Sequence, residues 1–110
     1  MRVLITGANG TVGSAIIDQL GGRDEYEFTC LDLEDHPDRE TVVADVTEID
    51  ELRGHFDGHD AVIHLAAAVD LDGSWEEILA ANVEGTYNVL QAAAEAEVET
   101  FVFASSMHTV

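Results

Sequence analysis

The most constraining feature of this chain is a short apolar segment followed by three glycines at three-residue spacing. Residues 2–6 (RVLIT) are typical of a buried strand, and an amphipathic helix is expected to begin near Thr11. Gly7 permits a tight exit from the strand, Gly10 lacks a Cβ and lets a pyrophosphate approach the backbone, and Gly13 lets the helix pack closely on the strand. The free N–H groups and the positive dipole end of the helix also face the position where the pyrophosphate would lie. The segment therefore predicts a strand–turn–helix unit that binds an anion.

The rest of the chain alternates predicted strands with predicted helices. We expect strands over 26–32, 41–44, 61–66 and 100–104, and helices over 14–20, 49–56, 75–81 and 83–96. Thr47 and Ser74 are the expected N-caps of the second and third helices. The run over 61–66 is apolar except for His64, as a central parallel strand requires. This order predicts an α/β fold: a Rossmann-like, doubly wound parallel sheet of about five strands in three αβα layers, with residues 1–110 forming one domain.

The charge balance is strongly acidic. Twenty-three Asp and Glu residues stand against four arginines and no lysine, which gives a net charge of −19. Nucleic acids and anionic membranes both require a basic surface, so neither is an expected partner. Either the acidic groups form an ordinary solvated shell, or the protein works in a high-salt cytoplasm; we favour the second. At molar salt the Debye length falls to about 3 Å, so an anionic ligand is no longer repelled from a distance.

The sequence also indicates a cytoplasmic protein. No apolar run approaches the roughly 20 residues that span a bilayer, and the N-terminus has no signal-peptide pattern. Cys30 is the only cysteine and falls within a predicted strand, which favours a buried, unreactive thiol. His36, His55 and His59 show no metal-ligand spacing, so we expect no metal site.

An acidic residue follows the second predicted strand at an informative distance. Asp32 lies close to 20 residues beyond the glycine turn, where a carboxylate can accept hydrogen bonds from the ribose hydroxyls of an adenosine. The alternative is a surface carboxylate within an acidic loop. A carboxylate that binds the ribose also repels a 2′-phosphate, which favours NAD over NADP. Arg39 is the only nearby cation that would reverse this preference.

Five motifs occur in one order along the chain. They are TGxxGxxG at 6–13, Asp-Val at 45–46, HLAA at 64–67, NVxGTxN at 82–88 and FASS at 103–106. Together they resemble the N-terminal part of the extended short-chain dehydrogenases/reductases, the NAD-dependent epimerase/dehydratase family. The resemblance extends over nearly the whole chain and implies NAD as the cofactor.

The resemblance implies a set of cofactor-binding residues: Gly7, Asn9, Gly10, Thr11, Val12, Gly13, Asp32, Leu33, Asp45, Val46, Leu65, Ala66, Ala67 and Asn82. For two of them a structural role is the alternative. Asp45 either contacts the adenine or caps the next turn, and Asn82 either orders the site or caps a helix. His64, inside an apolar run, is expected to be a core histidine.

The segment 101–110 (FVFASSMHTV) is similar to the FASSNH segment of uronate dehydrogenases and their haloarchaeal sugar-dehydrogenase relatives. The stretch from 75 to 88 also resembles that subgroup. The resemblance implies that Ser106 is catalytic, polarising the reacting hydroxyl or carbonyl during hydride transfer from a sugar C–H to NAD. It also implies that Ser106 and His108 contact the sugar, while Met107 stands where the subgroup has asparagine.

The family's proton-transfer pair is missing from these 110 residues. The resemblance implies a tyrosine with a lysine four residues later, but the chain has no lysine, and Tyr26 and Tyr87 are its only tyrosines. Loss of such a group costs roughly 10²–10⁴-fold in the proton-transfer step. We therefore expect a truncated dehydrogenase that is inactive alone.

Two hypotheses about function remain open. The chain is either the NAD-binding portion of an NAD-dependent sugar oxidoreductase, whether dehydrogenase or epimerase/dehydratase, or a stand-alone NAD-binding or interaction module without catalysis. An apolar edge left by truncation would favour association, so a homodimer is a possible assembly. The expected small-molecule partner of the parent enzyme is a sugar or a sugar derivative.

Overall fold

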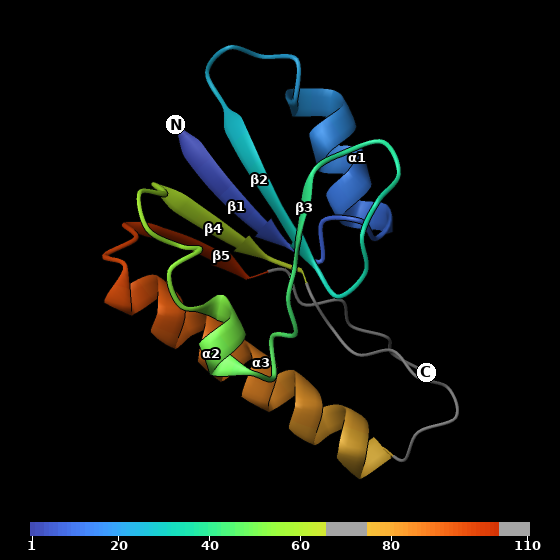
Figure 1. Cartoon of the computed structure of the whole chain (residues 1–110), viewed down its shortest axis with the longest axis vertical. Helices are drawn as coiled ribbons and strands as arrows, with labels where there is room; N and C mark the ends of the chain where they lie inside the picture. The colour runs from blue at the N-terminus through green and yellow to red at the C-terminus, as the bar shows by residue number, and fades with distance from the viewer. Residues whose placement is uncertain (66–74, 104–110) are drawn as a thin grey trace.

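The computed structural model of this chain describes residues 1–65 and 75–103 (Figure 1). In chain order the elements are β1 (Arg2–Thr6), α1 (Thr11–Leu20), β2 (Glu27–Asp32), β3 (Thr41–Val43), α2 (Ile49–Leu52), β4 (Ala61–His64), α3 (Trp75–Glu95) and β5 (Thr100–Phe103). The predicted alternation of strands and helices is confirmed.

All five strands join one parallel sheet in the order β3-β2-β1-β4-β5. The chain runs outward from β1 to β2 and β3, and then crosses back to place β4 on the other side of β1. In the centre of the sheet, Ile5 lies opposite both Cys30 and Ile63. The order therefore reverses between β1 and β4, and the carboxyl ends of strands at such a switch point form a crevice.

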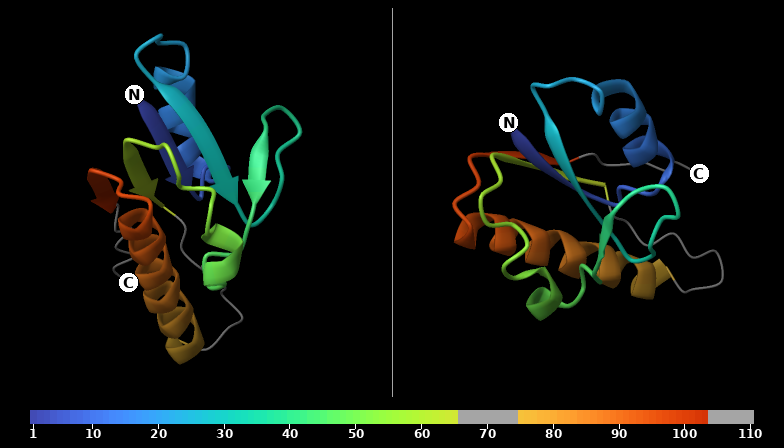
Figure 2. Two further views of the ribbon diagram at one scale, coloured as in Figure 1. Left: turned by 60° about the vertical axis from the view of Figure 1, so that its left-hand side comes forward. Right: turned by 45° about the horizontal axis from the view of Figure 1, so that its top comes forward.

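Helices cover both faces of the sheet, which confirms the three-layer prediction. Figure 2 shows α1 on one side of the strands and α2 and α3 on the other. Successive residues of β1 supply the two cores because side chains alternate across a strand. Leu4 is buried with Leu31 and Val62 on the α2–α3 side, whereas Val3 and Ile5 pack on the α1 side.

Residues 75–95 form one helix, so the prediction of two helices meeting near Asn82 is wrong. Asn82 lies in the interior of α3, which also contradicts its interpretation as a helix cap. The segment contains no proline, and its glycine, Gly85, does not end the helix. Gly85 is instead buried against the Val46 side chain, since a Cβ there would lie 2.8 Å from Val46 Cγ2.

Helix α2 is shorter than the predicted 49–56. It ends at Leu52 because Arg53 leaves the helical region, with φ −59° and ψ 135°, and Gly54 adopts a φ of +89°. Its N-cap is Glu48, without a side-chain capping bond, so the prediction that Thr47 caps it is wrong. Strand β4 ends at His64 rather than at position 66, and the expected cap Ser74 lies outside the described residues.

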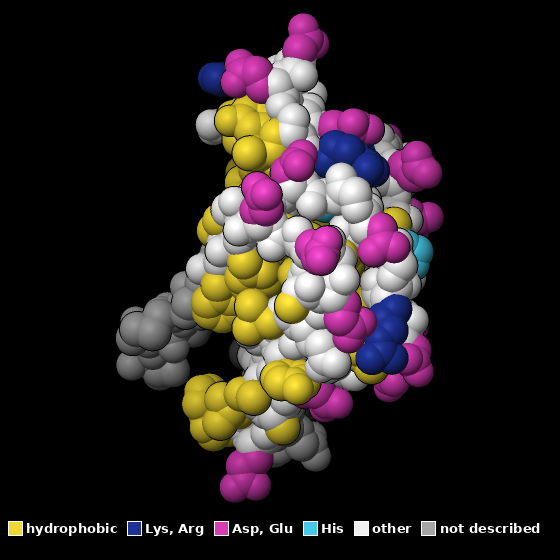
Figure 3. Space-filling view, turned by 90° about the vertical axis from the view of Figure 1, so that its left-hand side faces the viewer, with side chains coloured by type: hydrophobic (Ala, Val, Ile, Leu, Met, Phe, Trp, Pro, Cys, Tyr) yellow, Lys and Arg dark blue, Asp and Glu magenta, His cyan; other side chains and the backbone are white. Residues whose placement is uncertain are grey.

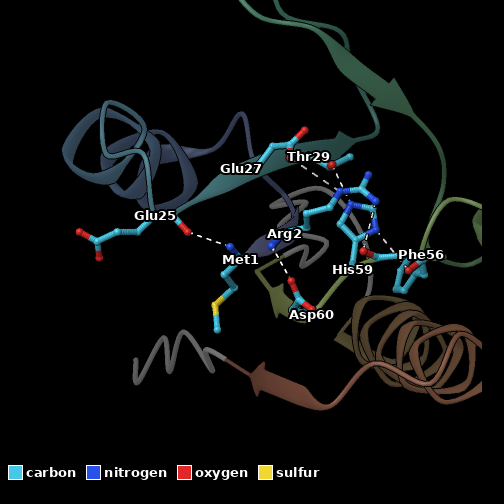
Figure 4. Close-up of polar contacts among 9 residues, drawn as sticks. Met1, Arg2, Glu25, Glu27, Thr29, Phe56, His59 and Asp60 are labelled. Atoms are coloured by element: carbon cyan, nitrogen blue, oxygen red, sulfur yellow. Dashed lines mark hydrogen bonds and ion pairs between the residues drawn. The ribbon is translucent and has the colours of Figure 1, made fainter.

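The amino ends of the strands are closed by a separate group of polar contacts (Figure 4). The Arg2 N–H donates to Asp60 Oδ2 at 2.8 Å, and the terminal ammonium donates to the Glu25 carbonyl at 2.8 Å. His59 is buried, with Nε2 2.7 Å from Thr29 Oγ1. These contacts give His59 a structural role at the end of the sheet opposite to the glycine turn.

The surface carries both acidic and apolar groups. Figure 3 shows acidic side chains spread over the face it presents, with hydrophobic side chains exposed among them. The large exposed apolar residues include several on α3 and β5, namely Trp75, Leu79, Val83, Tyr87, Leu90, Val102 and Phe103. Within the described part of the chain, no helix is both long and apolar enough to cross a bilayer.

Candidate cofactor site

A cavity of about 370 Å³ opens at the switch point of the sheet. It is bounded by the carboxyl ends of β1, β2 and β4, by the segment after β3 and by one turn of α3. Its lining residues are Gly7, Gly10, Leu31, Asp32, Leu33, Glu34, Ala44, Asp45, Val46, Thr47, Leu65, Ala81 and Asn82. Parallel topology thus brings together residues that are up to 75 positions apart in sequence (7 to 82).

Eight of the cofactor-binding residues predicted from sequence line this cavity: Gly7, Gly10, Asp32, Leu33, Asp45, Val46, Leu65 and Asn82. Four others, Asn9, Thr11, Val12 and Gly13, lie in the glycine turn or the first turn of α1. The remaining predicted residues, Ala66, Ala67, Ser106 and His108, lie outside the described residues. The sequence interpretation missed Leu31, Glu34, Ala44, Thr47 and Ala81, whose signal was only their adjacency to predicted residues.

The glycine turn has the backbone geometry that its spacing predicts. Gly7 has a φ of +69°, and its carbonyl accepts the Gly10 N–H at 3.1 Å. Gly10 is the N-cap of α1, and the first turn of that helix contains no acidic residue. The first-turn N–H groups and the helix dipole therefore present a positive end without a competing carboxylate from the helix itself.

The space available for a side chain differs between two glycines of the turn. A Cβ on Gly13 would lie 2.6 Å from the Ala8 carbonyl oxygen and 2.8 Å from both the Cα and the carbonyl carbon of Ala8. A Cβ on Gly10 would meet only the Gly7 carbonyl, at 3.3 Å. Close packing inside the protein thus requires the glycine at position 13, while position 10 leaves open space on the cavity wall.

Asp32 joins the end of β2 to the glycine turn. Its Oδ2 accepts the Asn9 N–H at 2.9 Å, and its Oδ1 accepts the Leu33 N–H at 2.7 Å. Asp32 is half-buried on the cavity wall, whereas the neighbouring acids Glu34 and Asp35 are exposed. The carboxylate is therefore fixed by backbone donors, and Asp32 lines the cavity.

Asn9 carries an unsatisfied buried acceptor. Its Nδ2 donates to the Glu34 carbonyl at 2.9 Å and to Thr41 Oγ1 at 3.3 Å. Its Oδ1 is buried and has no hydrogen-bond partner among the described residues. Such a group is costly unless a donor reaches it. Asn9 is not among the residues that line the cavity, whereas the glycine turn and the fixed carboxylate of Asp32 are on its wall and fit a ligand with phosphates and hydroxyl groups.

Asp45 and Asn82 define the far wall of the cavity. Asp45 Oδ1 accepts the Thr47 N–H at 2.9 Å and the Thr47 hydroxyl at 2.7 Å, so Asp45 caps the turn that follows β3. Both it and Asn82 also line the cavity. The neighbouring Val46 is held in place because Asn88 Nδ2 donates to its carbonyl at 3.0 Å.

Cys30 and Arg39 lie behind the glycine turn. Cys30 is buried, as predicted, and burial raises the pKa of its thiol even though the nearby Arg39 guanidinium acts in the opposite direction. The Arg39 guanidinium approaches Ser14 Oγ at 3.4 Å and the Ala8 carbonyl at 3.5 Å. Arg39, the one cation that the sequence places near Asp32, thus lies against α1.

His64 is a core histidine, as predicted. It is 1% exposed, and its ring lies 5.7 Å from that of Phe103 in a stacked arrangement. Burial lowers the pKa of His64 from 6.5 to about 4. Its two ring nitrogens contact Thr6 Oγ1 at 2.6 Å and Thr86 Oγ1 at 3.2 Å.

The lowered pKa of His64 predicts a loss of stability toward acid. Below pH 6.5 His64 is protonated in the unfolded chain but stays neutral in the folded chain until the pH approaches 4. The free energy of unfolding therefore falls as the pH drops and levels off near pH 4. Between pH 7 and pH 5 this contribution amounts to about 2 kcal/mol. Denaturant unfolding at both pH values checks it, with His64→Asn as the control that has no such proton. If the free energy of unfolding changed equally with pH in the two proteins, the lowered pKa of His64 would be contradicted.

Fold and site together define a dinucleotide-binding α/β protein: a parallel sheet with a glycine turn, a helix N-terminus and a fixed acid at its switch point. The model of the NAD dependent epimerase/dehydratase family matches residues 3–110, and the chain belongs to this family. The family is NAD-dependent, which confirms NAD as the expected cofactor.

Two of the curated relatives come from one haloarchaeon, Haloferax volcanii. The chain is 41% identical over 117 residues to an NAD-dependent glucose-6-phosphate dehydrogenase of Haloferax volcanii, covering 98% of the chain and 44% of the relative. It is 36% identical over 107 residues to an L-arabinose 1-dehydrogenase (NAD(P)(+)) of the same organism, covering 97% and 41%. The chain therefore spans about two fifths of the length of these relatives.

Solved structures agree with this assignment. A short-chain dehydrogenase/reductase superfamily protein from Agrobacterium tumefaciens with bound NAD matches with a TM-score of 0.84 and 34% identity, over 96% of this chain and 33% of that one. A uronate dehydrogenase variant from the same organism, complexed with NAD, matches with a TM-score of 0.77 and 31% identity, over 99% and 42%. The predicted likeness to uronate dehydrogenases and haloarchaeal sugar dehydrogenases is confirmed.

Proposed function

We propose that this chain is the NAD-binding portion of an NAD-dependent sugar oxidoreductase, either a dehydrogenase or an epimerase/dehydratase. The observation that carries the proposal is the cavity at the switch point, bounded by Gly7, Gly10 and the backbone-fixed carboxylate of Asp32. In this proposal residues 1–110 form one dinucleotide-binding domain. The names of the haloarchaeal relatives support a sugar as the substrate of the parent enzyme.

Each part of the cavity has a proposed role toward the dinucleotide. Gly10 and the first-turn amides of Thr11, Val12 and Gly13 hold the pyrophosphate, because that end of α1 carries positive partial charge and no Cβ at position 10 blocks approach. Asp32 accepts hydrogen bonds from the adenosine ribose. Asn9 supports this role through its backbone N–H, which donates to Asp32 Oδ2 at 2.9 Å.

The remaining predicted residues extend this arrangement along the cofactor. Leu33, Asp45 and Val46 are proposed to contact the adenine, since they lie on the cavity wall beyond Asp32. Asn82 and the segment Leu65, Ala66 and Ala67 are proposed to follow the cofactor toward its nicotinamide end. Leu65 and Asn82 line the cavity, while positions 66 and 67 are predictions from the motif alone.

The chemistry that NAD supplies when bound is acceptance of a hydride from a sugar carbon. In this proposal Ser106 polarises the reacting oxygen, and Ser106 and His108 contact the sugar. The chain contains no lysine to complete a tyrosine–lysine pair. We therefore propose that these 110 residues bind the cofactor but do not turn over substrate by themselves.

The alternative is a binding or interaction module without catalysis. The exposed apolar side chains of Val83, Tyr87 and Phe103, which are 62%, 65% and 54% accessible, favour a partner on this side of α3 and β5. A homodimer would satisfy that requirement. Size-exclusion chromatography with light scattering in molar salt distinguishes monomer from dimer.

Calorimetric titration of the chain with NAD and with NADP in 2 M KCl tests the proposed function. We expect saturable NAD binding and weaker NADP binding, and we expect NAD affinity to fall when the salt is reduced to about 0.1 M. At low salt the Debye length lengthens to about 10 Å, so the acidic protein repels the anionic ligand. No NAD binding at any salt concentration would refute the proposal, and stronger NADP binding would refute the role of Asp32.

A further inference from the structure

The side chain of His64 connects three segments that bound the cofactor cavity. Its Nδ1 lies 2.6 Å from Thr6 Oγ1 at the end of β1, and its Nε2 lies 3.2 Å from Thr86 Oγ1 on α3. The Leu65 N–H is shared between Thr6 Oγ1 and the Thr6 carbonyl oxygen, at 3.1 Å from each. One imidazole thus joins β1, β4 and α3 at the edge where the sheet meets the cavity.

Each partner of His64 adjoins a residue of the cavity wall. Thr6 directly precedes Gly7, and Leu65 follows His64 and lines the cavity itself. Thr86 lies four residues after Asn82 on α3, so both are on the same face of the helix. The imidazole does not line the cavity itself. It contacts residues that lie next to the cavity-lining residues Gly7, Leu65 and Asn82.

The contacts of the His64 ring are consistent with a neutral imidazole, and one of its two tautomers gives an unbroken chain of hydrogen bonds. Thr6 Oγ1 uses a lone pair to accept the Leu65 N–H. If its hydroxyl hydrogen then points to Nδ1, the chain of bonds runs in one direction, and Nε2–H donates to Thr86 Oγ1. Burial lowers the pKa of His64 to about 4, so the ring is neutral near pH 7.

We propose that His64, as the neutral Nε2–H tautomer, is a positioning residue that fixes the glycine turn, Leu65 and Asn82 relative to one another around the dinucleotide. This inference rests on the proposed function. It differs from a packing role, because packing against Phe101 and Phe103 needs only a flat ring, whereas positioning needs an acceptor at Nδ1 and a donor at Nε2.

Three variants separate the two roles. His64→Phe keeps the flat ring and removes both hydrogen bonds. His64→Asn places an amide oxygen near the Nδ1 position and restores an acceptor for Thr6. Thr86→Val removes the Nε2 partner with little change of shape and without touching the cavity wall. We expect NAD affinity to fall roughly tenfold in His64→Phe, roughly threefold in Thr86→Val, and no more than about threefold in His64→Asn.

The test combines NAD calorimetry with ¹⁵N NMR of the His64 ring in the chain without ligand at pH 7. We expect a protonated Nε2 and an unprotonated Nδ1 in the wild-type chain. A protonated Nδ1, or wild-type NAD affinity in both His64→Phe and Thr86→Val, would overturn the inference. If His64→Phe does not fold, Thr86→Val decides the binding arm. Absence of NAD binding by the wild-type chain is a different result, because it refutes the proposed function itself.

Discussion

Gly13→Ala is expected to destabilise the protein by about 2 kcal/mol or more. The added methyl carbon would lie 2.6 Å from the Ala8 carbonyl oxygen, and all three of its nearest atoms belong to the Ala8 backbone. Overpacking of this kind costs about 3 kcal/mol when the backbone must move, and the better helix propensity of alanine returns about 1 kcal/mol. Denaturant unfolding in high salt measures the difference.

Gly10→Ala is the matched control, because it places the same methyl group three residues earlier. Gly10 has φ −76° and ψ 178°, which alanine adopts freely, and the new Cβ would meet only the Gly7 carbonyl at 3.3 Å. We expect stability to change by no more than about 1 kcal/mol and NAD affinity to fall at least roughly tenfold, since the methyl stands where the pyrophosphate approaches. Equal stability losses in both variants, or full NAD affinity in Gly10→Ala, would contradict these roles.

Asp32→Asn is expected to weaken NAD binding by roughly 10–100-fold and to remove the preference for NAD over NADP. The loss follows from replacing hydrogen bonds between the ribose hydroxyls and a charged carboxylate, each about 1.5–3 kcal/mol, by bonds to a neutral amide of about 0.5–1.5 kcal/mol each. The affinity for NADP rises at the same time because a carboxylate no longer repels its 2′-phosphate. Titration of wild type and variant with both nucleotides gives the two affinities.

Asp35→Asn is the control for net charge in that experiment. Asp35 is exposed in the same loop and does not line the cavity, so its neutralisation removes one charge without altering the site. We expect Asp35→Asn to keep the wild-type preference for NAD over NADP. Because Asp32 also accepts the Asn9 N–H, the unfolding free energy of Asp32→Asn must be measured in parallel. A preference unaffected by Asp32→Asn, or altered equally by Asp35→Asn, would show that Asp32 does not discriminate between the nucleotides.

Much of the fold was predictable because its signals are local. The strand at Arg2–Thr6, the glycine turn and helix α1 follow one another without interruption, and each glycine has a backbone reason for its position. The parallel sheet followed from alternating elements. The same local signals placed Asp32 at the end of β2, where the structure has it.

The errors arose where a residue that is common at helix starts has another role in the structure. Asn82 looked like a helix start, since asparagine is a common N-cap, but α3 runs through it as one helix with no proline to interrupt it. Thr47 looked like a cap for α2, yet its hydroxyl donates to Asp45 at 2.7 Å and the helix begins without a side-chain cap. The roles of Ser106, His108, Ala66 and Ala67 stay predictions from the motifs.

The sequence by itself determined the strand–turn–helix unit, the alternation of elements and the acid at the end of β2, because these depend on residues that are neighbours in the chain. Only the tertiary structure decided which strands flank β1, how Asn9 and Asp32 meet across 23 positions, and how His64 joins Thr6 across 58 positions. The physical reason is that hydrogen-bond partners in a parallel sheet come from separate strands connected by crossovers. Their pairing is set when the sheet assembles, not by the spacing of residues along the chain.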